Sequence, residues 1–141
     1  METELINSLT NNFESFSNKT EDGVSFWFAR DLQQLLGYSK WDNFKNVIFK
    51  AKTACEVSEQ EVSDHFANVG KMVQIGSGAI KEIDDIMLTR YACYLIAQNG
   101  DSKKEQIAFA QTYFAVQTRK AELIEQRILE QERVQARQKL S

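Results

Sequence analysis

The side chains of this sequence best suited to binding a ligand are four lysines in one short segment: Lys40, Lys45, Lys50 and Lys52. The segment 40–52 holds these four bases and one acid, Asp42, a net charge of +3, whereas the whole chain carries −3. An acidic protein attracts a polyanion only where positive charge is concentrated locally, and ammonium groups bind phosphate oxygens. The spacing therefore predicts a local contact with nucleic acid. With neighbouring polar and aromatic side chains, the candidate DNA-binding set is Ser39, Lys40, Trp41, Asn43, Lys45, Asn46, Lys50 and Lys52.

Members of this set also have a structural interpretation. The lysines suit the solvated face of a structural helix, and Ser39 suits a helix N-cap. Trp41 suits a core position beside Phe44, and Asn43 suits polar surface. The sequence leaves both interpretations open.

Other reactive side chains are sparse. His65 is the one histidine, and Cys55 and Cys93 lack the spacing of metal ligands, so reduced, buried thiols are expected. The acidic cluster at 82–85 resembles part of a magnesium site, but carboxylates at a helix start explain it equally well. We therefore expect no metal, no cofactor and no enzymatic activity.

Two helices are predicted to hold the candidate residues. The spacing of leucines indicates a helix over 29–36, which Gly37 ends. A second helix is expected over about 40–55, with Ser39 as its N-cap. Two helices joined by a tight turn form a helix-turn-helix-like pair, in which one helix supports the other against nucleic acid.

The second of these helices has two faces. Lys45 and Lys52, seven residues apart, share a polar face that Asn46 and Lys50 extend. The opposite, apolar face follows steps of three and four residues: Trp41, Phe44, Ile48, Ala51 and Cys55.

A β-hairpin is predicted before these helices. It pairs 13–17 with 24–28 across an Asp-Gly turn at 22–23. In the alternative, a first helix over 2–12 continues through Phe16, and the second strand pairs elsewhere.

A second hairpin is predicted after the helices. It pairs 72–75 with 79–83, and the glycines at both ends of 76–78 supply positive φ angles. Between the basic helix and this hairpin, 56–71 is expected to be a polar loop with a helical turn around 59–65.

The last third of the chain is predicted to be helical. One helix is expected over about 85–98, begun by the aspartates at 84–85, and a second over 103–140, capped by Asp101 or Ser102. The first half of the latter holds expected core residues: Ile107, Ala110, Tyr113, Phe114 and Val116. The second half carries an apolar stripe among charges: Leu123, Ile124, Ile128 and Leu129.

These elements predict an α+β fold: a small antiparallel sheet of hairpins, a helix-turn-helix-like pair and a long C-terminal helix. We expect a domain over 1–120 and a projecting helix over 121–141. No apolar run approaches the ~20 residues that span a bilayer, and the N-terminal residues are too polar for a secretory signal. A cytoplasmic protein without membrane contact is expected.

Three segments together resemble one bacterial family: FWFARDLQQLLGYSKWDNFKNVIFKAKTAC at 26–55, HFANVGKMVQIGSGAIKEIDDIMLTRYACYLIAQNGD at 65–101, and KKEQIAFAQTYFAVQTRK at 103–120. The family is that of DNA-damage-inducible protein D (DinD), whose N-terminal part is a branch of the Bro-N domain of phage antirepressors. The general Bro-N pattern corresponds to Phe26–Phe28, Ala29–Leu32 and Leu36–Tyr38. The resemblance covers about residues 13–125.

The resemblance implies an α+β fold, a DNA-binding role, a link to the SOS response and an interaction with RecA filaments, without catalysis. Family members are about twice as long, so the chain resembles an N-terminal portion that stops inside a helix. Our first hypothesis is a DNA-associated regulatory module that contacts single- or double-stranded DNA weakly or non-specifically through 40–52. The alternative is an adaptor that binds RecA filaments, and a homodimer through 119–140 is a related prediction.

Overall fold

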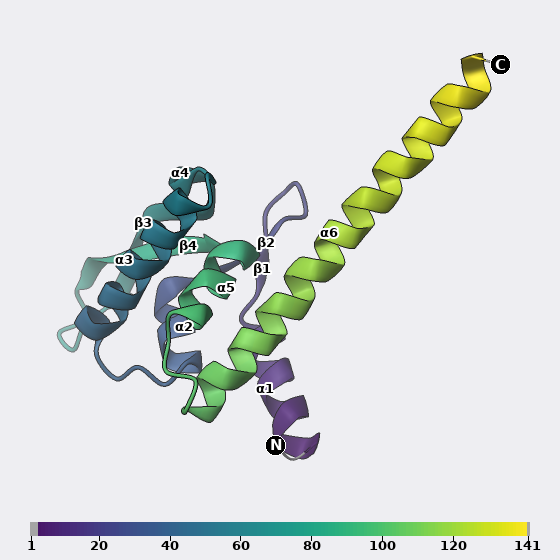
Figure 1. Cartoon of the computed structure of the whole chain (residues 1–141). Helices are drawn as coiled ribbons and strands as arrows, with labels where there is room; N and C mark the ends of the chain where they lie inside the picture. The colour runs from purple at the N-terminus through teal and green to yellow at the C-terminus, as the bar shows by residue number, and fades with distance from the viewer. Residues whose placement is uncertain (1–2, 141) are drawn as a thin grey trace.

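A computed structural model describes residues 3–140 of the chain as four antiparallel strands and six helices (Figure 1). The elements are α1 (Thr3–Ser15), β1 (Asn18–Lys19), β2 (Ser25–Phe28), α2 (Ala29–Leu35), α3 (Trp41–Val57), α4 (Val62–His65), β3 (Phe66–Gln74), β4 (Ile80–Thr89), α5 (Arg90–Gln98) and α6 (Glu105–Leu140). This confirms the predicted α+β fold. Residue 2, where the first helix was expected to begin, lies outside the described residues.

The sheet has the order β1-β2-β4-β3, so β4 is paired on both sides while β3 lies at an edge. Its register places Trp27 and Phe66 on either side of Leu88. All three side chains are buried, and together they form an apolar row across the three longer strands. This row is the inner face of the sheet, on which the helices pack.

Aromatic side chains join the N-terminal helix to α6. Phe13 of α1 packs on Tyr113 and Phe114 of α6, with ring centroids 5.3 and 5.4 Å apart. Trp27 meets Phe114 edge to face, and its indole nitrogen donates a 2.9 Å hydrogen bond to the carbonyl oxygen of Phe13. The helix α5, which has five buried residues, lies between α3 and α6 (Figure 1).

The predicted first hairpin is largely wrong. Residues 13–15 belong to α1, and β1 keeps only two residues opposite β2. Phe13 explains the difference. In the helical backbone its ring is buried against Phe114 of α6, a contact between distant residues that the alternating sequence pattern does not reveal. As in the alternative, the helix continues well past residue 12 and β2 finds a second partner in β4. The expected turn remains, with Gly23 at φ 83°.

The second hairpin is longer than predicted. Phe66 to residue 71, expected as a loop, pairs with β4, which runs through the aspartates at 84–85. The expected helix start at these aspartates is therefore wrong: α5 begins at Arg90, where the Thr89 hydroxyl accepts a 3.2 Å hydrogen bond from the amide of Ala92. Pairing with β3 over 80–88, joined by β2 over 87–89, holds this segment extended. Of the two turn glycines, only Gly78 has a positive φ, at 82°.

The helix α6 is unbroken over 36 residues and continues beyond the body of the molecule (Figure 1). Asp101 caps the turn before it, accepting a 3.0 Å hydrogen bond from the amide of Lys103. Four of the five expected core residues in its first half are buried, but Val116 is 46% exposed, so that expectation is wrong. Within residues 3–140 there is no helix long and apolar enough to cross a membrane.

Candidate nucleic-acid interface

A groove runs between α3 and the hairpin of β3 and β4, with a volume of about 530 Å³. Its size falls within the range of about 300–1,000 Å³ that is usual for ligand pockets. One wall comes from α3 and the other from the two strands. The residues that line it are Trp41, Lys45, Asn46, Ile48, Phe49, Lys52, Asn68, Val69, Asp84, Asp85 and Ile86.

The predicted helix supplies one wall because its two faces separate as expected. Phe44, Ile48, Ala51 and Cys55 are all buried, which fixes the rotation of α3 about its axis. The preceding turn is also as predicted, with Gly37 at φ 80° after α2. Ser39 is not the N-cap, however, since α3 begins after Lys40 and makes no side-chain cap bond with any described residue.

The groove contains half of the predicted DNA-binding set. Trp41, Lys45, Asn46 and Lys52 line it together. Lys45 is exposed, whereas Lys52 is half-buried with its Nζ 6.0 Å from the ring centroid of Phe66. Neither lysine takes part in an ion pair, since the one salt bridge among the described residues joins Arg119 to Glu122. Both ammonium groups are therefore available to an anion.

The other half of the set lies outside the groove. Lys50 follows Lys45 by five residues, a rotation of about 140° around the helix, and Asn43 lies on the same far side. Ser39 and Lys40 are exposed in the junction before α3. By this rotation Lys50 does not share the face of Lys45, contrary to the expectation, and the groove brings together only four of the eight residues.

Arg30 of α2 fixes the start of α3. Its guanidinium carbon lies 3.9 Å from the centroid of the Trp41 ring, the geometry of a cation–π contact. Its Nε donates a 2.9 Å hydrogen bond to the backbone carbonyl of Asp84. Because these contacts link α2, α3 and β4, they hold Trp41 at one end of the groove.

Asp85 is a buried carboxylate with a structural task. One oxygen accepts hydrogen bonds from the backbone amides of Arg30, at 3.0 Å, and Ile86, at 2.8 Å. It thereby caps α2, whose own N-cap residue, Phe28, offers no side-chain acceptor. Its other oxygen has no hydrogen-bond partner within the described part of the chain.

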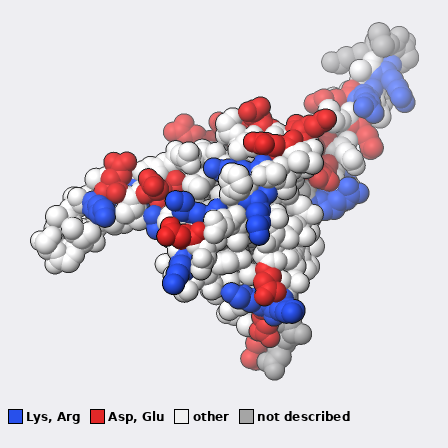
Figure 2. Space-filling view, turned by 60° about the vertical axis from the view of Figure 1, so that its left-hand side comes forward, with Lys and Arg blue, Asp and Glu red and all other residues white. Residues whose placement is uncertain are grey.

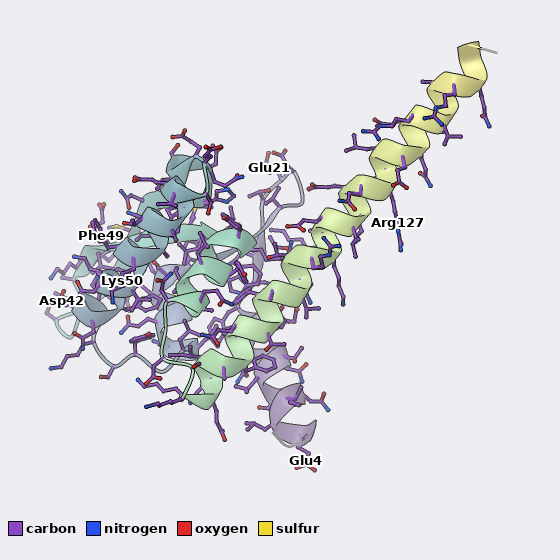
Figure 3. All side chains as sticks on the ribbon, viewed as in Figure 1. Glu4, Glu21, Asp42, Phe49, Lys50 and Arg127 are labelled. Carbon is purple, nitrogen blue, oxygen red and sulfur yellow. The ribbon has the colours of Figure 1, made fainter. Side chains whose placement is uncertain are left out.

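Phe49 is a groove residue on α3 that the sequence pattern did not single out. It lines the groove beside Lys45 and Lys52, yet 71% of its surface is exposed. Figure 3 labels it on α3, on the side of the molecule away from α6. Its position four residues after Lys45 places both on one helical face, which is the signal that could have identified it.

Charges of both signs surround the groove. Asp84 and Asp85 line its strand side, and the face that Figure 2 brings forward shows acidic and basic side chains intermixed rather than one basic field. Asp31, in the first turn of α2, interacts with one of these aspartates: burial raises the pKa of its carboxyl, Lys71 lowers it and Asp85 raises it further. The positive charge that lines the groove is therefore limited to Lys45 and Lys52.

The match to a known family follows this architecture. Residues 16–115 match the BRO family N-terminal domain, and the chain belongs to that family. It is 47% identical over 119 residues to DNA damage-inducible protein D of Escherichia coli (strain K12), an alignment that covers 84% of this chain and 43% of that protein. The chain thus spans less than half the length of this relative. The resemblance identified from the sequence is confirmed, and no solved structure matches the chain.

Proposed function

We propose that this chain is a non-enzymatic, DNA-contacting regulatory module of a bacterial DNA-damage response protein, related to antirepressors and acting in the cytoplasm. Membership of the BRO family and the name of the E. coli relative support the regulatory class. The observation that carries the DNA contact is a groove in which Lys45 and Lys52 have no acidic partner among the residues described.

The groove lysines bind phosphate oxygens while the rest of the groove stays fixed. The buried face of α3 and the Arg30 contact to Trp41 hold this wall in place, so little order is lost on binding. Few phosphates are neutralised, and binding is accordingly weak and not sequence-specific. The rest of the predicted set lies outside the groove and makes at most a second contact with the DNA: Ser39, Lys40, Asn43 and Lys50.

The salt dependence of binding separates these two sets of lysines. Each neutralised phosphate of duplex DNA contributes about −0.9 to the slope of log affinity against log salt concentration. Two groove lysines give a slope of about −1.8, whereas all four lysines of the segment give about −3.6. A fluorescence-anisotropy titration of labelled DNA at several salt concentrations measures this slope.

A pair of matched variants tests the proposal. Lys45→Gln/Lys52→Gln removes the groove charges, and Lys40→Gln/Lys50→Gln removes the same charge outside it. We expect the first to weaken DNA binding severely and the second to weaken it little. Failure of the wild-type chain to bind DNA even at low salt would refute the proposal, and equal loss in both variants would refute the role of the groove.

The projecting part of α6 supports a second candidate, a protein adaptor. Beyond the body of the domain its apolar side chains are about half exposed, with Ile124 at 57% and Ile128 at 50%. We propose that 1–120 forms the domain and that 121–141, whose last residue lies outside the described part, is an interaction helix for the RecA filament or for a second copy. Retention of the chain on RecA filaments but not on bare DNA in co-sedimentation supports the filament; retention on bare DNA supports the first candidate.

A further inference from the structure

Phe49 is exposed among cations rather than packed against protein. Apart from Val57, it is the most exposed large apolar side chain of the described residues, at 71%. Phe49 lines the groove from α3, and Trp41 lines it from the first residue of the same helix. An aromatic ring beside lysines is the arrangement by which proteins stack bases while holding phosphates.

The polar groups of the groove include both hydrogen-bond donors and hydrogen-bond acceptors. Asn46 and Asn68 offer amide donors and acceptors, and Asp84 offers a carboxylate acceptor. The acidic residues at 84–85 disfavour a phosphate on the strand side of the groove, which leaves the side of Lys45 and Lys52 for it. The edge of a nucleobase carries donors as well as acceptors, so it suits this lining better than a bare anion does.

We infer that this groove binds an unpaired nucleobase of single-stranded DNA, stacked on the ring of Phe49, with the adjoining phosphates at Lys45 and Lys52. In a duplex the faces of the bases are covered by their neighbours, and only the edges can be reached from the grooves. The exposed ring therefore has a partner in a single strand that it lacks in a duplex. The inference rests on the proposed DNA contact and specifies its ligand.

The test compares single-stranded and duplex DNA on the full chain. Labelled oligonucleotides of about 12 nucleotides, a length within the usual site sizes, are titrated as (dC)12, as (dT)12 and as a duplex of the same length. Phe49→Ala is compared with Phe49→Trp, which keeps a stacking ring, and with Phe49→Leu, which keeps apolar bulk. Phe16→Ala is the matched control, since Phe16 is 39% exposed and lies outside the groove.

Phe49→Ala and Phe49→Leu should weaken single-strand binding by about 5-fold to about 150-fold, the range measured for base–aromatic stacking. Phe49→Trp and Phe16→Ala should retain it, and duplex affinity should change little in any of them. Binding should also quench the fluorescence of Trp41, because Trp27, the other tryptophan, is buried at 1% exposure. The carboxylate of Asp84 should favour (dC)12, which has an amino donor, over (dT)12.

Five outcomes overturn the inference. Equal losses for single strands and duplex, or wild-type affinity in Phe49→Leu, would show that stacking is not involved. A change in oligomeric state of Phe49→Ala by sedimentation, with single-strand affinity unchanged, would assign the ring to a second copy of the chain. If Lys45→Gln/Lys52→Gln weakens binding and Phe49→Ala does not, the inference fails while the proposed function stands; if the wild-type chain binds no DNA, both fail.

Discussion

The helix α3 and the second half of α6 are both amphipathic and charged, but only α3 has its apolar face covered. Phe44 and Ile48 of α3 are buried against the body, whereas Ile124 and Ile128 of α6 are exposed over about half of their surface. Figure 3 shows side chains on both flanks of α6 around Arg127, extending away from the body of the molecule. The same helical periodicity of apolar residues thus corresponds to a buried face in α3 and to an exposed face in the second half of α6.

The comparison shows what burial does for a binding surface. Because the apolar face of α3 is buried, the backbone positions of Lys45 and Lys52 are fixed relative to the hairpin, and a ligand has only their side chains to order. The tail of α6 is supported by its own backbone hydrogen bonds and carries its charges without such a frame. We therefore expect changes to the apolar residues of α3 to affect folding, and those of the tail to affect association.

The largest expected effect is on stability. Phe44→Ala should lower the free energy of unfolding by about 3–5 kcal/mol, because it removes a fully buried ring and leaves a cavity. Ile128→Ala, the matched change in the tail, should stay within about 0.5 kcal/mol for the monomer. Urea denaturation followed by circular dichroism measures both. Similar losses in the two variants would contradict the comparison.

A smaller effect is expected on self-association. If a second copy covers the tail, burial of one isoleucine side chain contributes about 1.5–3 kcal/mol, so Ile128→Glu should separate the copies. Gln126→Glu adds the same charge on another side of the helix and should leave association intact. Sedimentation velocity at several concentrations distinguishes these outcomes, and a wild-type monomer at tens of micromolar would remove the idea of a homodimer.

The smallest effect is expected where α6 leaves the body. His65 and the tail residues Glu122 and Glu125 line one cavity there, and the His65 Nδ1 lies 2.7 Å from the hydroxyl oxygen of Thr89. Burial lowers the pKa of His65 below 6.5, and Asp64 opposes this. The folded state then binds its proton less readily than the unfolded state does, so stability should fall slightly as the pH falls below about 6.5. The variant His65→Gln should lose this component of the pH dependence in urea titrations at about pH 5.5 and about pH 7.5.

Local patterns in the sequence were sufficient where packing follows helical phase. The buried face of α3, the turn at Gly37 and the unbroken α6 were predicted because each depends on neighbours within a few positions. Asp85 shows where this reasoning ends. Two adjacent aspartates before an apolar run are typical of a helix start, but here the strand continues, and one carboxylate caps a helix 55 residues earlier.

The candidate site was predicted in part for the same reason. Lys45 and Lys52 were placed on one face by their spacing of seven, and the structure brings them to the groove. Asn68 and Asp84 could not be assigned to it, because only the pairing of β3 with β4 brings them opposite α3. Phe49 could not be identified in the same way, because phenylalanine is usually buried and its exposure here is visible only in the structure.

Because Asp85 of β4 caps α2, the stability of α2 depends on the position of β4. The first turn of α2 lacks an acceptor until β4 has docked, since no nearer side chain at its start supplies one within the described chain. Opening of the hairpin would therefore loosen α2 and, through Arg30, the indole at the end of the groove. A strand of nucleic acid clamped between helix and hairpin would slow hydrogen exchange at amides of α2 that it never touches.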